Sequence, residues 1–164
     1  MKREYSSLHN NLQVDYRGFN LKTTAVIAAI SHRQGLVAWK DYNKAVKIPD
    51  FVDFIQLLNQ KVNAKSWSMF MDNLSVHRSK AVRNELERIN VTPIYNVVYS
   101  PEYNPIEMSF AIVKQRFRAL KTNDIINNSS QKTIDLIKAG FNSIDPGITR
   151  KHIDHCERLI QHRA

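Results

Sequence analysis

Apolar residues recur along the chain with two different periods, and each period predicts its own kind of element. Residues 23–31 (TTAVIAAIS) are mostly β-branched or apolar, and residues 35–39 (GLVAW) follow a polar turn, which predicts a strand and its hairpin partner. Short apolar runs at 67–73 (WSMFMDN) and 93–100 (PIYNVVYS) predict two further strands. We therefore expect a sheet that contains these four segments.

Helical periodicity fills the stretches between and after the strands. Apolar residues three and four positions apart predict amphipathic helices, as for Phe51, Phe54, Ile55, Leu58 and Val62. Proline is well tolerated in the first turn of a helix, so the segment that opens with PIE is also expected to be helical. The predicted helices span residues 49–62, 79–89, 105–120, 131–141 and 148–162, and the polar residues 122–130 are expected to close the third.

This order of strands and helices indicates an α/β domain with helices packed on a mixed sheet. The chain has 164 residues and is 43% hydrophobic, and a chain of this size buries roughly 70% of its unfolded surface. It contains no internal repeat and no low-complexity tract. We expect residues 1–164 to form a single domain.

Charge and cysteine content narrow the choice of partner and location. The chain carries 24 Lys and Arg against 15 Asp and Glu, a net charge of +9, which favours polyanionic partners such as nucleic acid or an acidic membrane. Cys156 is the single cysteine, and the N-terminus lacks the apolar core of a signal peptide. The longest apolar run, residues 25–30, is far shorter than the ~20 residues of a membrane span. We expect a soluble, intracellular protein.

Two carboxylates are expected to meet at one edge of the sheet. Asp72 ends a predicted strand, and Glu107 lies in the first turn of the helix that follows the next strand. Ligands of α/β sheets gather where strands end and helices begin. Carboxylates brought close together repel each other, and a divalent cation such as Mg²⁺, which takes oxygen ligands, would relieve that repulsion. This pattern predicts a metal site.

A purely structural interpretation of the same two residues stays open. A glutamate in the first turn of a helix complements the positive end of the helix dipole. An aspartate at a strand end often caps the following turn. Spacing and composition alone do not separate these roles from metal binding.

The segments MFMDNLSVHRS and IYNVVYSPEYNPIE together resemble the catalytic core of the Tc1/mariner and IS630-like transposases, members of the DDE superfamily. In that family a strand-end Asp is followed by Asn and then His, and the closing carboxylate lies in a YSPxxNPIE box. The 34 residues from 73 to 106 separate Asp72 from Glu107, as in the family. The resemblance covers residues 21–120 well and the C-terminal helices more vaguely.

The resemblance implies an RNase H-like fold and a DNA endonuclease of the transposase or integrase type. It implies that Asp72 and Glu107 are the second and third catalytic, metal-binding acids, with Mg²⁺ or Mn²⁺ as cofactor. The partners it implies are transposon ends and target DNA, with a homodimer allowed. The location would be the nucleus in a eukaryote and the cytoplasm in a bacterium.

One departure from the family concerns its first catalytic Asp. That residue ends the first strand, about 80 to 100 residues before the second acid, and counting back from Asp72 runs off the N-terminus. Asp15 is the nearest upstream acid in a plausible strand and could substitute, but its position corresponds better to the segment after the missing strand. The helix-turn-helix units that precede the catalytic domain are also missing. We therefore expect an N-terminally truncated domain without its first strand, a poor enzyme, and a strand at 23–31 with exposed or non-native pairing.

Other polar residues near the two acids are candidates for supporting roles. Asn73, His77 and Asn104 flank the carboxylates and could orient them, although Asn residues often only stabilise loops and His77 could cap the following helix. Lys114 and Arg118 are candidates for DNA binding, although a basic helix face is often only solvated. The segment 152–156 (HIDHC) falls short of a zinc-site pattern and is expected on a helix surface.

Two other functions compete with a DNA endonuclease. A non-catalytic DNA-binding or interaction module derived from a transposase would keep the fold and the basic charge, and would bind DNA without cleaving it. A cellular nuclease of the RNase H type is the second, and the YSPEYNPIE box argues against it.

Overall fold

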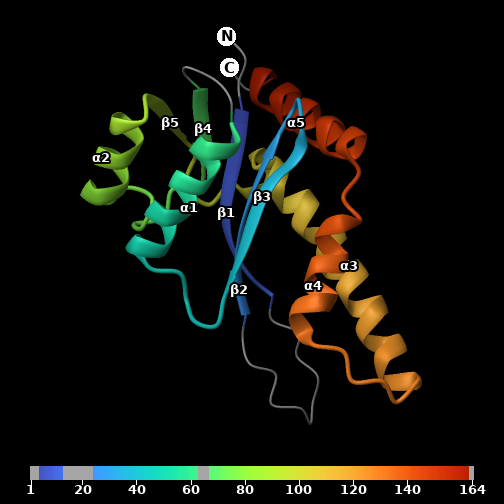
Figure 1. The fold of residues 1–164 in the computed structure, drawn as a ribbon. Coiled ribbons are helices and arrows are strands. Elements are labelled where there is room, and N and C mark those ends of the chain that lie inside the picture. The colour runs from blue at the N-terminus through green and yellow to red at the C-terminus, as the bar shows by residue number, and fades with distance from the viewer. Residues whose placement is uncertain (1–3, 13–23, 63–66, 163–164) are drawn as a thin grey trace.

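The computed structural model describes residues 4–12, 24–62 and 67–162, with the backbone alone described for residues 4–12. Five strands form one sheet: β1 (Glu4–Leu12), β2 (Thr24–Ser31), β3 (Gly35–Tyr42), β4 (Trp67–Met71) and β5 (Val91–Tyr95). Their order across the sheet is β3-β2-β1-β4-β5. The pairs β1·β2 and β2·β3 are antiparallel, whereas β4 runs parallel to both β1 and β5 (Figure 1).

The expectation of a missing first strand is wrong. β1 lies at the centre of the sheet between β2 and β4, so β2 has a neighbour on each side and no abnormal edge. The sequence of β1, EYSSLHNNL, has no alternation of apolar and polar residues that would reveal a strand. Because backbone hydrogen bonds hold a strand in a sheet whatever its side chains, a polar segment can fill the central position.

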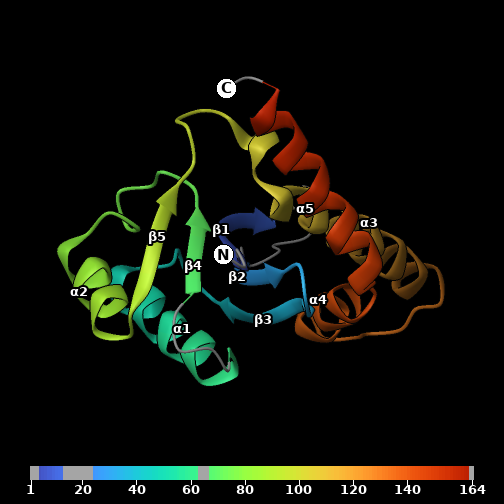
Figure 2. The same cartoon turned by 90° about the horizontal axis from the view of Figure 1, so that it is seen from above.

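Helices cover both faces of the sheet (Figure 2). On one face lie α1 (Ile48–Lys61) and α2 (Lys80–Arg88), and on the other lie α3 (Pro105–Ile126), α4 (Thr133–Asn142) and α5 (Pro146–Gln161). A short 3₁₀ helix, η1 (Pro101–Tyr103), precedes α3. None of the helices in the described ranges is long and apolar enough to cross a membrane.

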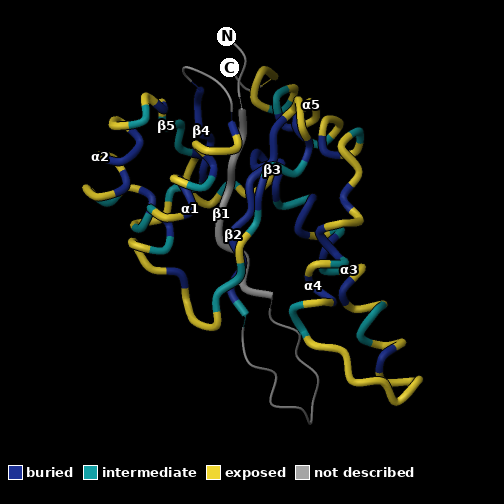
Figure 3. Tube along the Cα trace, in the orientation of Figure 1, coloured by how far each residue is buried: buried dark blue, intermediate teal, exposed yellow. Residues whose placement is uncertain are grey.

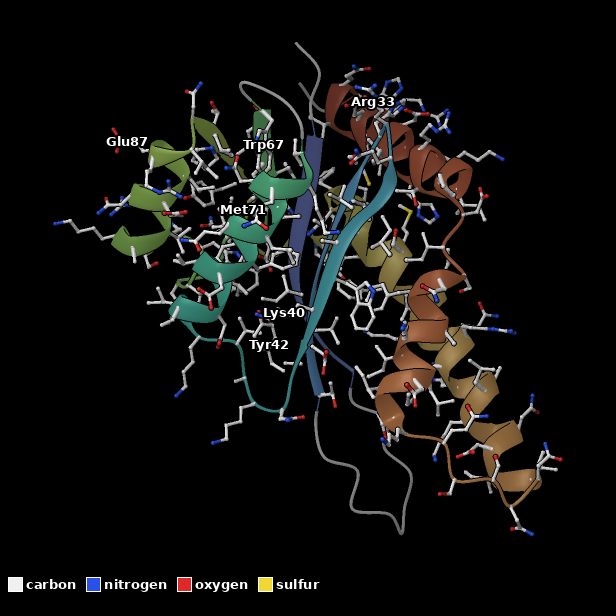
Figure 4. The ribbon with its side chains drawn as sticks, in the orientation of Figure 1. Arg33, Lys40, Tyr42, Trp67, Met71 and Glu87 are labelled. Atoms are coloured by element: carbon white, nitrogen blue, oxygen red, sulfur yellow. The ribbon has the colours of Figure 1, made fainter. Side chains whose placement is uncertain are left out.

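Each face of the sheet has its own hydrophobic core, because successive side chains of a strand point to opposite faces. Ala25, Ile27 and Ala29 of β2 pack toward α1 and α2, whereas Val26 and Ala28 pack toward α3, α4 and α5. Figure 3 shows that β2 is almost entirely buried and that the outer sides of the helices are exposed. Figure 4 shows that Trp67 and Met71 of β4 lie on the α1 side. Burial on both faces explains why the predicted strands are continuous apolar runs.

Most predicted elements are confirmed, and the largest errors concern the bounds of β5 and α3. The last strand is Val91–Tyr95, so residues 96–100 form a loop and not the end of a strand. Helix α3 continues to Ile126, through polar residues that were expected to end it. The extension is held by Asp124, whose carboxylate accepts hydrogen bonds from Lys121 Nζ at 2.8 Å and the Gln131 N–H at 3.0 Å, as well as from the Ser129 hydroxyl.

Candidate functional site

Asp72 directly follows β4, at the carboxyl end of the strand. The turn after it is compact, because the N–H groups of His77 and Arg78 both donate to the Leu74 carbonyl, over 3.1 and 3.3 Å. The Asp72 side chain is 28% exposed, but its Oδ1 atom is buried. The exposed part of this side chain is therefore on its other atoms, and one side of the carboxylate faces outward.

The His77 imidazole contacts the buried side of the Asp72 carboxylate. The imidazole is buried, and its Nδ1 lies 3.0 Å from the Asp72 carbonyl oxygen and 2.6 Å from Asp72 Oδ1. Both neighbours are oxygen acceptors, so Nδ1 carries the ring proton. The hydrogen bond goes to the carbonyl, whereas Oδ1 is in contact without the geometry of a hydrogen bond. The Phe51 ring, 4.7 Å away between centroids, supports the imidazole from α1.

His77 does not cap α2, which was the alternative left open by the sequence. The cap is Ser79, whose Oγ accepts a hydrogen bond from the Val82 N–H at 3.4 Å. Asn73 lies beside Asp72 and accepts a hydrogen bond from Arg78 Nη1 at 3.2 Å. These contacts place Asn73 in the turn itself, while His77 contacts the candidate ligand.

Glu107 lies half-buried in the first turn of α3. The helix begins at Pro105, after Asn104, whose carbonyl accepts a hydrogen bond from the Glu107 N–H at 3.1 Å. Asn104 is buried, and so is Ile106, which packs in the core between the sheet and α3. Pro105 and the core residue Ile106 directly precede Glu107, and together they fix the position of its backbone.

Asp72 and the segment that leads to Glu107 lie at the same end of the sheet. β4 and β5 are parallel neighbours, so they terminate at the same edge. The Asn96 N–H, just after β5, donates to the carbonyl of Met71, the residue before Asp72, over 2.7 Å. Figure 2 shows η1 and the start of α3 at this end of the sheet. Sequence analysis missed Asn96, because only the pairing of β4 with β5 brings it to Met71.

Asp72 and Glu107 are the two candidate metal ligands at this edge. In the register of β1 against β4, Glu4 pairs with Met69 and Tyr5 with Phe70, so Ser7 is level with Asp72. Glu4, the one acid in β1, is thus three positions from that level, or about 10 Å along the strand. In the described ranges no group of three or more His, Cys, Asp or Glu is placed to hold a metal. Asp15 lies outside the described residues.

The donors present nevertheless suit a hard divalent cation. Carboxylate oxygens are the ligands that Mg²⁺ and Mn²⁺ prefer, and Mg²⁺ is commonly held by one or two carboxylates with water and substrate phosphate completing its shell. Asp72 presents one side of its carboxylate outward while His77 occupies the other. These donors therefore fit a divalent cation whose remaining ligands are water or a bound phosphate.

The two candidate DNA-binding residues follow Glu107 along α3. Lys114 is half-buried and Arg118 is exposed, about 10 and 16 Å from Glu107 along the helix axis. Lys121, further along, pairs with Asp124 at 2.8 Å. Arg118 is thus the more accessible of the two candidates.

The segment 152–156 lies on α5 and does not form a metal site in the described residues. Its placement on a helix surface is wrong for Cys156, which is buried and donates from Sγ to the Glu102 carbonyl at 3.4 Å. Burial raises the pKa of the Cys156 thiol to about 11, so it stays protonated and unreactive. Burial, with His155 nearby, lowers the pKa of His152. This segment supports η1, which precedes Glu107.

Comparisons with known proteins agree with this geometry. The family model of the DDE superfamily endonucleases matches residues 9–127. The chain belongs to this family. A search of curated protein sequences found no match.

Solved structures show the same fold at low sequence identity. The catalytic domain of the Mos1 mariner transposase matches with a TM-score of 0.67 and 14% identity, over 98% of this chain and 82% of that one. The catalytic core of BIV integrase matches with a TM-score of 0.58 and 14% identity, over 85% and 82%. The predicted membership in the DDE superfamily and the RNase H-like fold are confirmed, and the chain shares its fold with the catalytic domains of mariner transposase and BIV integrase.

Proposed function

We propose that this domain cleaves phosphodiester bonds in DNA and transfers the freed strand, with Asp72 and Glu107 as ligands of Mg²⁺ or Mn²⁺. The observation that carries the proposal is the position of these acids, which leave one end of the sheet with the family's spacing of 34 intervening residues, 73 to 106. Related Mos1 structures are described as complexes with Mn or Mg. That similarity supports a divalent metal as the cofactor.

Each residue of the site has a separate task in this proposal. Asp72 and Glu107 would hold the metal, and His77 would keep one side of the Asp72 carboxylate fixed so that the other side faces the ligand. Asn73 and Asn104 would stabilise the two turns from which the acids project. When bound, divalent ions in such sites activate the attacking oxygen and stabilise the leaving one.

DNA is the proposed partner, both as the end of a mobile element and as its target. The net charge of +9 supports a polyanionic ligand. Two Mos1 structures are described as a strand transfer complex and a paired end complex. We expect Arg118→Ala and Lys114→Ala each to weaken binding to all duplexes similarly and to reduce the slope of log K against log salt by about 1. Sedimentation of the DNA complex would show whether two copies of the chain assemble on it.

The direct test is nicking of a labelled duplex by the purified chain. We expect slow cleavage that requires Mg²⁺ or Mn²⁺ and disappears in Glu107→Gln. Asp135→Asn is a matched control, because Asp135 is an exposed acid in the first turn of α4. If both variants lose cleavage, removing any acid from the first turn of a helix impairs the domain. That result would contradict the proposed role of Glu107.

The source of a third carboxylate can be tested in the same assay. The family match begins at residue 9 and therefore includes Asp15. If Asp15 supplies the third ligand, Asp15→Asn abolishes cleavage as completely as Glu107→Gln does. If Asp15→Asn cleaves normally, Asp15 is not a required ligand, and the other acids of this chain suffice for cleavage.

The alternative is a non-catalytic DNA-binding module. The observation in its favour is that, among the described residues, no group of three or more His, Cys, Asp or Glu is placed to hold a metal. If the chain is such a module, its binding to DNA weakens steeply with added salt. It then shows no metal-dependent cleavage under any condition.

A further inference from the structure

The loop between β5 and η1 exposes an unusual run of apolar side chains. Val97, Val98 and Tyr99 are 66%, 53% and 98% exposed, and they are consecutive in sequence. Single exposed apolar residues are common on protein surfaces, but contiguous ones mark interaction sites. We call residues 97–99 the aromatic loop.

The aromatic loop is held firmly although its side chains face solvent. Asn96, which is buried, donates from Nδ2 to the Ser100 carbonyl at 2.7 Å and accepts at Oδ1 from the Val97 N–H at 2.8 Å. The two bonds close the loop at its base. Tyr99 has a φ of 58°, in the left-handed region that bulky residues rarely adopt. The fold thus maintains an unfavourable backbone conformation with an aromatic ring directed into solvent, which is a pattern found at functional sites.

The position of the aromatic loop connects it to both candidate metal ligands. Asn96, at its start, is bonded to Met71, the residue before Asp72. Ser100, at its end, leads through η1 into the first turn of α3, where Glu107 lies. The aromatic loop therefore lies, along the chain, between the two segments that carry the acids.

We propose that the aromatic loop is a docking site for an unpaired nucleobase, on whose face the Tyr99 ring stacks. This inference rests on the proposed function, because it takes DNA as the partner; the stacking contact itself needs no bound metal. A nucleobase is flat and has an apolar face, so it matches a single exposed aromatic ring flanked by two valines, and stacking of this kind tolerates any sequence. The basic charge of the chain would hold the strand while the loop engages the base.

The experiment measures base stacking without cleavage. The full chain is titrated, in EDTA, into a duplex with a short single-stranded overhang that ends in the fluorescent base 2-aminopurine. We expect quenching of the fluorophore by the wild-type chain and by Tyr99→Phe, and no quenching by Tyr99→Ala. Tyr99→Ala should also weaken binding of the overhang duplex by about 5- to 100-fold, and binding of a blunt duplex by less than about 2-fold.

Two controls separate stacking from folding and from surface apolarity. Tyr99→Gly should keep the fold, because glycine accepts a φ of 58°, and should lose the quenching. Ile126→Ala removes an apolar side chain that is 71% exposed at the far end of α3, and should quench like the wild type. Normal quenching by Tyr99→Ala and Tyr99→Gly would overturn the proposal.

The outcome is independent of whether the chain cleaves DNA. Glu107→Gln should retain quenching while it loses cleavage, so a chain that stacks but never cleaves refutes the proposed function and not this inference. If the wild-type chain fails to quench, the inference is wrong. If Tyr99→Ala instead converts a dimer into a monomer in sedimentation without DNA, the aromatic loop joins two copies of the chain, which also overturns the proposal.

Discussion

Asp72 and Asp124 are two carboxylates that the fold treats in opposite ways. Asp124 is buried, and hydrogen bonds from Lys121, Ser129 and Gln131 occupy both of its oxygens. Among the described residues none donates a hydrogen bond to the Asp72 carboxylate. Its buried oxygen, Oδ1, contacts His77 Nδ1 without the geometry of a hydrogen bond. A buried carboxylate that stabilises the fold has its oxygens hydrogen-bonded within its own chain. A carboxylate that binds a ligand needs an oxygen that the chain leaves accessible to that ligand.

The largest expected effect of this difference is on cleavage. Asp72→Asn should reduce DNA cleavage by roughly 100-fold or more, since an amide is a much weaker metal ligand than a carboxylate. The same variant should change the free energy of unfolding by less than about 1 kcal/mol, because no hydrogen bond to the carboxylate is lost. Asp124→Asn should give the reverse result, with normal cleavage and a lower Tm. Cleavage rates and thermal melts of both variants would test the comparison, which fails if each loses the same property.

The contact of His77 with Asp72 gives the next largest effect. His77→Leu keeps the bulk against Phe51 but leaves the Asp72 carbonyl without its donor, so we expect a loss of about 1–3 kcal/mol in stability. We also expect metal affinity to fall about 10- to 100-fold, as for other residues that orient a metal ligand.

His77→Asn separates these two effects, because its amide can donate near the position of Nδ1. It should recover metal affinity better than it recovers packing. Equal metal affinity in His77→Leu and the wild type would show that His77 serves folding alone.

Asn96 follows β5, and loss of its side chain should affect stability and not the metal site directly. Asn96→Ala removes both side-chain hydrogen bonds that close the aromatic loop, so we expect a destabilisation of about 1–3 kcal/mol in urea unfolding. Hydrogen exchange should quicken at Val97 and in the loop after it. Unchanged exchange there would mean that η1 and α5, and not Asn96, hold this loop.

The smallest effect concerns acid stability. The hydrogen bond from Lys121, followed by those from Ser129 and Gln131, lowers the pKa of Asp124 from 3.8 to about 2. A lowered folded-state pKa means that its stabilisation is complete above about pH 4 and is lost as the pH falls toward 2. Asp124→Asn should therefore flatten the dependence of Tm on pH in this window only. An identical acid profile in the variant would show that other carboxylates dominate it.

The spacing of apolar residues in the sequence predicted the strands and helices whose side chains form the core. Strands β2 and β4 and helices α1 and α2 follow directly from buried runs and stripes. β1 escaped detection because its residues are polar, and only the pairing of β2 with β4 through a central strand identifies it. The end of α3 was misplaced because Asp124 binds groups beyond the helix, which sequence spacing cannot reveal.

The candidate site was predictable to a similar extent. Spacing and the two motifs placed Asp72 at a strand end and Glu107 in a first helical turn, and the structure places them there. The contact between His77 and Phe51 and the bond from Asn96 to Met71 join segments that are far apart in sequence, so no local pattern predicts them. The roles of the acids in metal binding stay a prediction.

Binding of Mn²⁺ to the metal-free chain, followed by electron paramagnetic resonance as the free ion disappears, tests the central claim most directly. If Asp72 and Glu107 share a cation, Asp72→Asn and Glu107→Gln each weaken Mn²⁺ binding by about tenfold or more. Asp124→Asn and Asp135→Asn leave it unchanged. Mn²⁺ affinity that is the same in the wild type, Asp72→Asn and Glu107→Gln would contradict a metal site at this edge of the sheet.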